Sequence, residues 1–218
     1  MDHRIRGEVA RAELEELGAK HYLDVRATVR RMLESLPASP RAAFAAAVTE
    51  RLLRGSHPGE TREARDVDSY AALARPLLDT IWAGLSGTED NEEQVCEAVG
   101  RFYLSRYLCT HRHDDPASMA DHIAMCALYT AECYLHGGWE FASWTGWRGF
   151  DAAAIRAAAD ADWPHRRPSG VTLFAWELTH PVIQAELERQ LEDIELLAEG
   201  DEGDDTQDLP TLVNRLRT

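Results

Sequence analysis

Residues 116–138, PASMADHIAMCALYTAECYLHGG, decide the fold that this sequence predicts. Drawn as a helix, the stretch carries apolar side chains on nearly every face, among them Met119, Ile123 and Leu128. A helix that is apolar all round is buried inside a protein, because no face of it gains from contact with water. We therefore expect a central buried helix near 116–135, ended by the glycine pair that follows it.

Helical periodicity extends outward from this stretch over most of the chain. Strand-like alternation is almost absent, and VTLFAW at 171–176 reads equally well as a strand or as a buried helix. Pro76 interrupts one apolar pattern and is expected to kink or restart that helix. The helical segments are 7–17, 20–36, 39–53, 68–85, 90–109, 116–135 and 180–199. The expected N-terminal signals are Ser39 with Pro40, Asp90 with Glu93, Asp115 with Pro116, and Thr179 or His180 with Pro181.

These patterns predict an all-α, multi-helix bundle of about seven to nine helices. The chain has 218 residues, which suits one domain over residues 1–198. Residues 199–218 are expected to form a disordered acidic linker followed by a short amphipathic tail that docks back onto the bundle or onto a partner.

The chain is acidic, with a formal net charge of −15 from 38 acidic and 23 basic residues. Such a surface repels nucleic acid and anionic membrane and favours a basic protein partner. Six of the acidic residues lie in 199–208, and the net charge without that stretch is −9. The folded part is therefore only moderately acidic, which weakens the case for strong electrostatic steering.

The N-terminus alternates charges, and no apolar run reaches the ~20 residues that span a bilayer. A cytoplasmic protein is expected, with its four cysteines reduced and mostly buried. No cofactor-binding motif is present, so no cofactor is expected. The usual phosphate-loop, dinucleotide, nucleophile-elbow and zinc-protease motifs are all missing, which lowers the odds of an enzyme.

Two groups of residues are candidates for a site. His111, His113 and Asp114 in one loop, with Asp121 and His122 on the central helix, are possible metal ligands. The competing interpretation is a solvated capping loop and buried polar side chains that bond neighbouring helices.

The second group lies in WEFASWTGWRGF, residues 139–150, where aromatic residues are dense. Trp139, Trp144 and Trp147, with Glu140, are candidates for a binding surface, since Trp is enriched in binding hot spots. The competing interpretation is a corner of the core filled by large rings.

The sequence also resembles the YjaG-like family, a bacterial family of uncharacterised helical proteins. PRAAFAAAVTERLL with a following LLDTIW helix is similar to the opening of that family, and SMADHIAMCALYTAECYLHGGWEFASWTGWRGFDAA to its middle. HPVIQAELERQLEDIELL is similar to its closing helix. The resemblance covers roughly residues 28–198, departs from the pattern in the Trp-rich segment and around HRHDD, and implies an all-α fold without assigning catalytic residues.

Two classes of function follow. The first is a non-enzymatic protein-binding domain, such as an immunity-type or regulatory partner protein in bacteria, because a small acidic helical domain without catalytic motifs suits binding a basic protein. The second is a metal-dependent or small-molecule-processing helical enzyme that uses the region of His111, His113 and Asp114.

Overall fold

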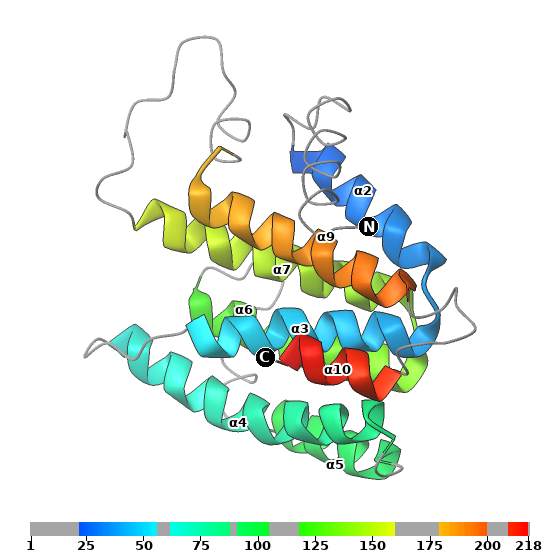
Figure 1. The fold of residues 1–218 in the computed structure, drawn as a ribbon. Coiled ribbons are helices and arrows are strands. Elements are labelled where there is room, and N and C mark those ends of the chain that lie inside the picture. The colour runs from blue at the N-terminus through cyan, green and yellow to red at the C-terminus, as the bar shows by residue number, and fades with distance from the viewer. Residues whose placement is uncertain are drawn as a thin grey trace.

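The computed structural model describes residues 22–55, 62–87, 91–104, 118–159, 179–199 and 209–217. These residues form eight helices and no strand, which confirms the all-α multi-helix bundle (Figure 1). The helices are α2 (Tyr22–Ser35), α3 (Ala38–Gly55), α4 (Arg62–Leu85), α5 (Glu92–Tyr103), α6 (Met119–His136), α7 (Trp139–Ala158), α9 (Pro181–Glu199) and α10 (Leu209–Arg217).

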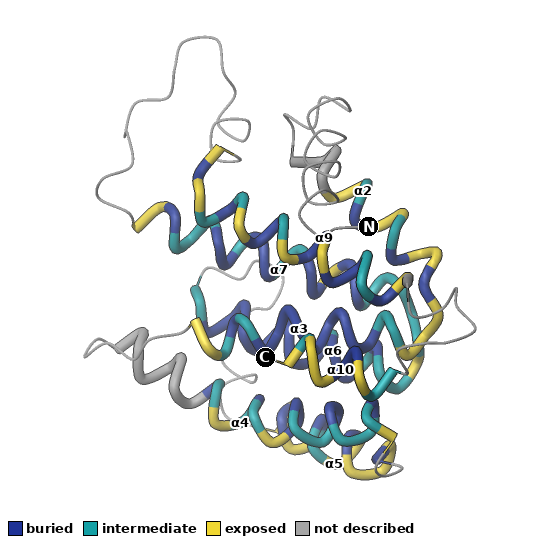
Figure 2. The backbone as a smooth tube through the Cα atoms, viewed as in Figure 1, coloured by how far each residue is buried: buried dark blue, intermediate teal, exposed yellow. Residues whose placement is uncertain are grey.

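The α6 helix lies at the centre of the bundle, as its sequence predicts. It packs against α3, α4 and α7 and also contacts α5, and twelve of its residues are buried. Figure 2 shows the buried positions concentrated on α3, α6 and α7. On the outside, α9 covers α7 and α3, α2 covers α7, and α10 lies across α3 and α4. Among the described helices, none combines enough length with enough apolarity to cross a bilayer.

The start of α6 differs from the prediction. The helix begins at Met119 rather than near residue 116, and its N-cap is Ser118. The Ser118 hydroxyl accepts from the Asp121 main-chain N–H, and the Asp121 carboxylate accepts from the Ser118 N–H and Oγ, which forms a capping box. Aspartate at the third helical position serves here in place of the glutamate or glutamine usually found there. Gly137 ends the helix in the left-handed conformation, with φ of 67°.

Replacing Ser118 with alanine removes the side-chain acceptor of this cap. We expect the free energy of unfolding to fall by about 1 kcal/mol, since that is the usual cost of losing a serine N-cap. Urea unfolding followed by circular dichroism measures the loss. Ser118→Thr, which keeps a hydroxyl that both accepts and donates, should recover most of it, and equal losses in both variants would show that the cap contributes little.

The starts of α3, α4 and α5 also differ from the expected ones. The α3 helix begins at Ala38, one residue before the predicted cap, and α4 begins at Arg62 rather than at residue 68 and runs without a break through Pro76. The N-cap of α5 is Asn91, which makes no side-chain cap but donates from its amide to the Thr80 carbonyl at 3.0 Å. At α9 the prediction is confirmed, since His180 Nδ1 accepts from the main-chain N–H two residues later.

The Trp-rich segment belongs to one long helix, α7, which continues to Ala158. Two glycines allow it to approach its neighbours closely. A Cβ added to Gly149 would lie 2.7 Å from Val48 Cγ1, and one added to Gly146 would lie 3.0 Å from Gln190 Oε1. The first distance is shorter than real side chains allow and the second is tighter than most of their contacts, so the glycines of WTGWRG let α7 lie close to α3 and α9.

The tail helix α10 docks back onto the bundle, with Leu212 and Val213 buried. Other predicted features lie outside the described residues. They are the helix at 7–17, the cap at Asp90 and Asp115 with Pro116, the run at 171–176 and the acidic linker from residue 200 to 208.

Candidate protein-binding surface

The three tryptophans of α7 point in different directions. Two of them pack beneath α2: the Arg26 guanidinium lies 3.4 Å from the centre of the Trp147 ring, and that of Arg30 lies 4.4 Å from the Trp139 ring. Cation–π contacts of this kind contribute about 0.5–1 kcal/mol each at partly exposed sites. These two rings therefore help to hold α2 on α7. Packing within the protein, one of the two interpretations given for the Trp-rich segment, thus applies to Trp139 and Trp147.

Trp144 is the tryptophan of this segment that faces outward, with 40% of its surface exposed. Its ring lies 5.3 Å from that of Tyr129 on α6 and 5.4 Å, edge to face, from that of Phe141. Aromatic pairs at these spacings hold each other in place. An exposed ring that is already held loses little side-chain entropy on binding, which is the property of an interface anchor.

Two exposed residues lie at the end of α5, a helix that contacts α6. Tyr103 is 52% exposed and Leu104 85% exposed. The pKa of Tyr103 is raised by partial burial and by the nearby Glu132 carboxylate and Tyr129, which places it beside α6. We call Tyr103, Tyr129, Phe141 and Trp144 the aromatic face.

The charged groups beside the aromatic face include two carboxylates, with His136 beside Phe141 and Arg148 one helical turn after Trp144. Glu132 is one-quarter exposed and lies 3.3 Å from His136. Glu140, half-buried, precedes Trp144 by one helical turn on the same side of α7. Carboxylates around exposed rings complement a basic protein surface and repel an acidic one.

Sequence reasoning found Trp144 and Glu140 but missed Tyr103 and Tyr129. A signal for Tyr103 was present: Val95, Val99 and Phe102 follow one helical stripe, and all three are buried. Tyr103 falls off that stripe and is left exposed. Tyr129 had no such signal, because nearly every position around it on α6 is buried.

The residues proposed as metal ligands are only partly described. His111, His113 and Asp114 lie outside the described residues. Asp121 is committed to the capping box, and His122 is 2% exposed with no hydrogen-bond partner for Nδ1. Burial, assisted by the Arg148 charge, lowers the pKa of His122 to about 4. In the described part of the chain, no three His, Cys, Asp or Glu side chains gather to hold a metal ion.

A small cleft opens where α2, α7 and α9 meet. Its volume is about 30 Å³, and it is lined by Arg26, Val29, Ser143, Gly146, Trp147, Phe150, Leu187 and Gln190. One water molecule needs at least about 10–15 Å³, so the cleft has room for about two or three waters. Pockets for small organic ligands are roughly ten times larger, so this cleft does not support a small-molecule site.

A buried ion cluster joins α3 to α9. Arg51 contacts Asp193 at 2.5 Å and Glu186 at 3.3 Å, and both carboxylate side chains are 7% exposed. Gln190 donates to Glu186 at 2.9 Å and to the Gly146 carbonyl at 2.9 Å, which extends the cluster to α7. One guanidinium thus serves two buried carboxylates that lie about two turns apart on α9.

We expect the free energy of unfolding to fall as pH rises through the interval in which Asp193 titrates. Burial outweighs the Arg51 charge and raises its pKa from 3.8 to about 6. The folded state therefore holds a proton that the unfolded state has lost between these values, so stability is highest below the interval and declines as pH rises through it. Asp193→Asn should flatten this decline in urea titrations at several pH values. An unchanged slope in Asp193→Asn would assign the decline to another group.

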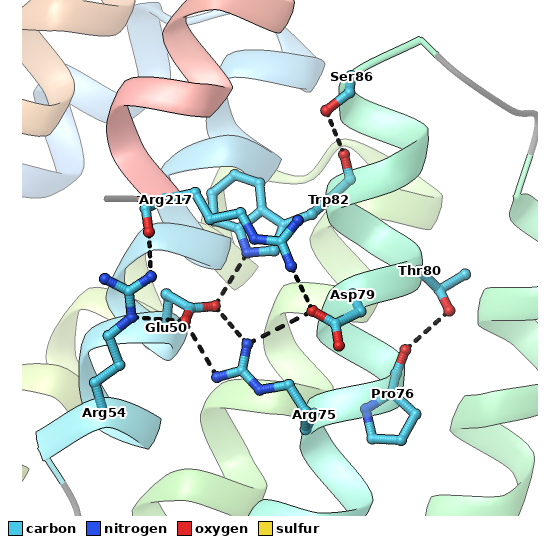
Figure 3. Close-up of polar contacts among 9 residues, drawn as sticks. All are labelled: Glu50, Arg54, Arg75, Pro76, Asp79, Thr80, Trp82, Ser86 and Arg217. Carbon is cyan, nitrogen blue, oxygen red and sulfur yellow. Dashed lines mark hydrogen bonds and ion pairs between the residues drawn. The ribbon is translucent and has the colours of Figure 1, made fainter.

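A second polar cluster joins α3 to α4 (Figure 3). Glu50, 4% exposed, accepts from Arg75 at 2.8 Å, from Arg54 at 2.9 Å and from Trp82 Nε1 at 3.3 Å. Burial alone raises the pKa of Glu50, but the bonds and charge of Arg75, with those of Trp82 and Arg54, lower it below its ordinary value. The Asp79 carboxylate lies 3.6 Å from Arg75 at the edge of this cluster.

Three of the four cysteines are described, and none is in a disulfide. Cys126 and Cys133 are buried, while Cys96 is exposed. Burial raises the pKa of the Cys133 thiol to about 12 and that of Cys126 further. Thiols with pKa values this high are poor nucleophiles, so these two residues act as small core side chains.

Comparison of the chain with family models, with curated proteins and with solved structures found no match. The resemblance to the YjaG-like family therefore stays a prediction. The surface itself, and the chemistry of the side chains on it, must carry any functional argument.

Proposed function

We propose that this protein is a non-enzymatic protein-binding domain of the immunity or regulatory kind. Its contact surface is the aromatic face, and its partner is a basic protein. The observation that carries the proposal is the 40% exposure of a Trp144 ring already held by Tyr129 and Phe141. Exposed aromatic residues at the centre of a patch are the side chains that dominate binding energy in protein interfaces.

Two further features support a basic protein as the partner. The carboxylates beside the aromatic face, Glu132 and Glu140, form an acidic rim, and the chain without residues 199–208 carries a net charge of −9. Complementary charge speeds association and excludes acidic competitors, while the buried rings supply affinity. The exposed rings and the acidic rim together favour a basic protein as the partner.

Site-specific photo-crosslinking in the native cells tests this proposal. A photoreactive phenylalanine analogue replaces Trp144, and in a matched control it replaces Arg189, which is exposed on α9. We expect the Trp144 position to capture one basic protein that the Arg189 position does not. Identical crosslinks from both positions, or none from Trp144, would count against a binding surface at the aromatic face.

A further inference from the structure

The groove that α10 occupies has the features of a peptide-recognition site. It is formed by α3 and α4, with α9 touching one side. Leu212 and Val213 of α10 are 3% and 1% exposed, while Leu209 and Leu216 pack against the same core from its edge. An amphipathic helix that inserts apolar side chains into a groove is a common mode of peptide recognition.

Arg217 of α10 makes two polar contacts with the groove (Figure 3). Its guanidinium lies 2.7 Å from Asp79 Oδ1 on α4. Arg54 on α3 donates to its main-chain carbonyl. The groove therefore contacts both the side chain and the backbone of a single arginine at the end of an apolar helix.

The charged cluster beneath α10 is complete without it. Glu50 keeps its bonds from Arg54, Arg75 and Trp82, and Asp79 keeps its contact with Arg75. Departure of α10 leaves the buried Glu50 carboxylate paired and exposes the apolar surface beneath Leu212 and Val213. Another amphipathic helix can cover that surface equally well, which is not true of an element whose loss leaves a buried charge alone.

We propose that this groove binds an arginine-bearing amphipathic helix of a partner protein, and that α10 is its intramolecular occupant. The pattern to be matched is Val213 with Arg217 four residues later, preceded by Leu212. The groove offers Asp79 for a guanidinium and lies on an acidic chain, so a basic helix fits and an acidic one does not. This surface is separate from the aromatic face and does not rest on the function proposed for it.

Tethering sets how the exchange works. Residues 200–208 join α9 to α10, and a tether of this length holds its helix at an effective concentration on the order of millimolar. A partner helix in solution therefore competes poorly with an intact α10. Substitutions that weaken the docking of α10 should free the groove. The experiment therefore compares such a chain with the wild-type chain.

The test uses the full chain with its tail helix disabled by Leu212→Asp and Val213→Asp. The probe is a fluorescein-labelled peptide of residues 208–218, DLPTLVNRLRT, followed by fluorescence anisotropy. We expect the tail-disabled chain to bind this peptide at least about tenfold more tightly than the wild-type chain does, because the competing tether is gone.

The arginine contact is tested by a double-mutant cycle. A peptide carrying Arg217→Ala should bind about two- to fivefold more weakly, as expected for losing an exposed ion pair. Asp79→Asn in the tail-disabled chain should give a similar loss, with little further loss on combining the two. A peptide carrying Asn214→Ala, whose side chain is exposed on α10, is the matched control and should bind unchanged.

Three results would overturn the proposal. The first is a folded tail-disabled chain that binds the peptide no more tightly than wild type. The second is binding indifferent to both Arg217→Ala and Asp79→Asn. The third is concentration-dependent dimerisation of the wild-type chain with no peptide binding, which assigns the groove to a second copy. If the tail-disabled chain does not fold, a second variant keeps the natural tail helix and carries a protease site at residues 202–207, which is cut after folding. Failure of the labelled peptide to exchange into the cut protein also overturns the proposal.

Discussion

Replacing Arg51 with methionine should lower the free energy of unfolding by about 3–5 kcal/mol, the usual cost of breaking a buried ion pair by removing one partner. Glu186 and Asp193 share this guanidinium, and both are almost fully buried. Methionine fills much of the volume but supplies no positive charge. The loss should be smaller at acidic pH, because the remaining carboxyl groups can then be buried as neutral acids. Urea unfolding followed by circular dichroism at two pH values measures both effects.

Arg54→Met is the matched control, since it removes the same side chain from the same helix. Arg54 is 49% exposed, and its partner Glu50 keeps Arg75 and Trp82. Its loss should cost less than about 1 kcal/mol, as for other exposed pairs. Equal losses in Arg51→Met and Arg54→Met would contradict the importance assigned to the buried cluster.

Gly149→Ala should destabilise the protein by about 1–3 kcal/mol, the usual cost of overpacking a tight core. Helix propensity alone predicts the opposite sign, because alanine is favoured over glycine inside helices. The added Cβ would lie 2.7 Å from Val48 Cγ1 and 3.1 Å from Glu186 Oε1, so α7 and α3 would have to move apart. Thermal and urea unfolding of purified variants measure the change.

Two further variants make this prediction specific. Gly100→Ala on α5 places its Cβ where nothing lies within 4 Å, and it should stabilise the protein by about 0.5–1 kcal/mol. Val48→Ala combined with Gly149→Ala removes the clashing methyl and should cost less than the two single losses added together. A stabilising effect of Gly149→Ala would show that the spacing of α7 and α3 is set elsewhere.

The sequence predicted the fold well where several local signals agreed. The central α6, the start of α9 at Pro181 and the docking of a short tail helix all follow from apolar stripes together with prolines, glycines or caps. Start positions were less certain, because Ser118 and Asp115 are both good caps and only the tertiary packing selects one. Pro76 was expected to kink its helix or to restart it, and α4 continues through it without a restart.

The candidate site could be predicted only in part. The Trp-rich segment was recognised as a candidate. The sequence does not show which of Trp139, Trp144 and Trp147 is exposed, because that depends on how α2 packs against α7. Arg26 and Arg30 cover two of the rings, and this pairing between residues more than a hundred positions apart has no local signal. The acidic and basic partners of the buried clusters are likewise distant in the sequence, as with Arg51 and Asp193.

The two proposed binding surfaces lie on different helices and differ in how a partner reaches them. The aromatic face is formed by α5, α6 and α7, whereas the α10 groove is formed by α3 and α4. The first is open in this structure, and the second is filled by the chain itself. A partner that uses the aromatic face should therefore bind with or without α10, and a partner helix that uses the groove should depend on its release.

The affinity of the crosslinked basic partner for purified variants tests the central claim most directly. Isothermal titration calorimetry compares the wild-type chain with Trp144→Ala and with the control Arg189→Ala. A protein-binding domain centred on the aromatic face predicts at least about a tenfold loss for Trp144→Ala, equivalent to ~1.4 kcal/mol, and little change for Arg189→Ala. Unchanged affinity in a folded Trp144→Ala variant would contradict the account.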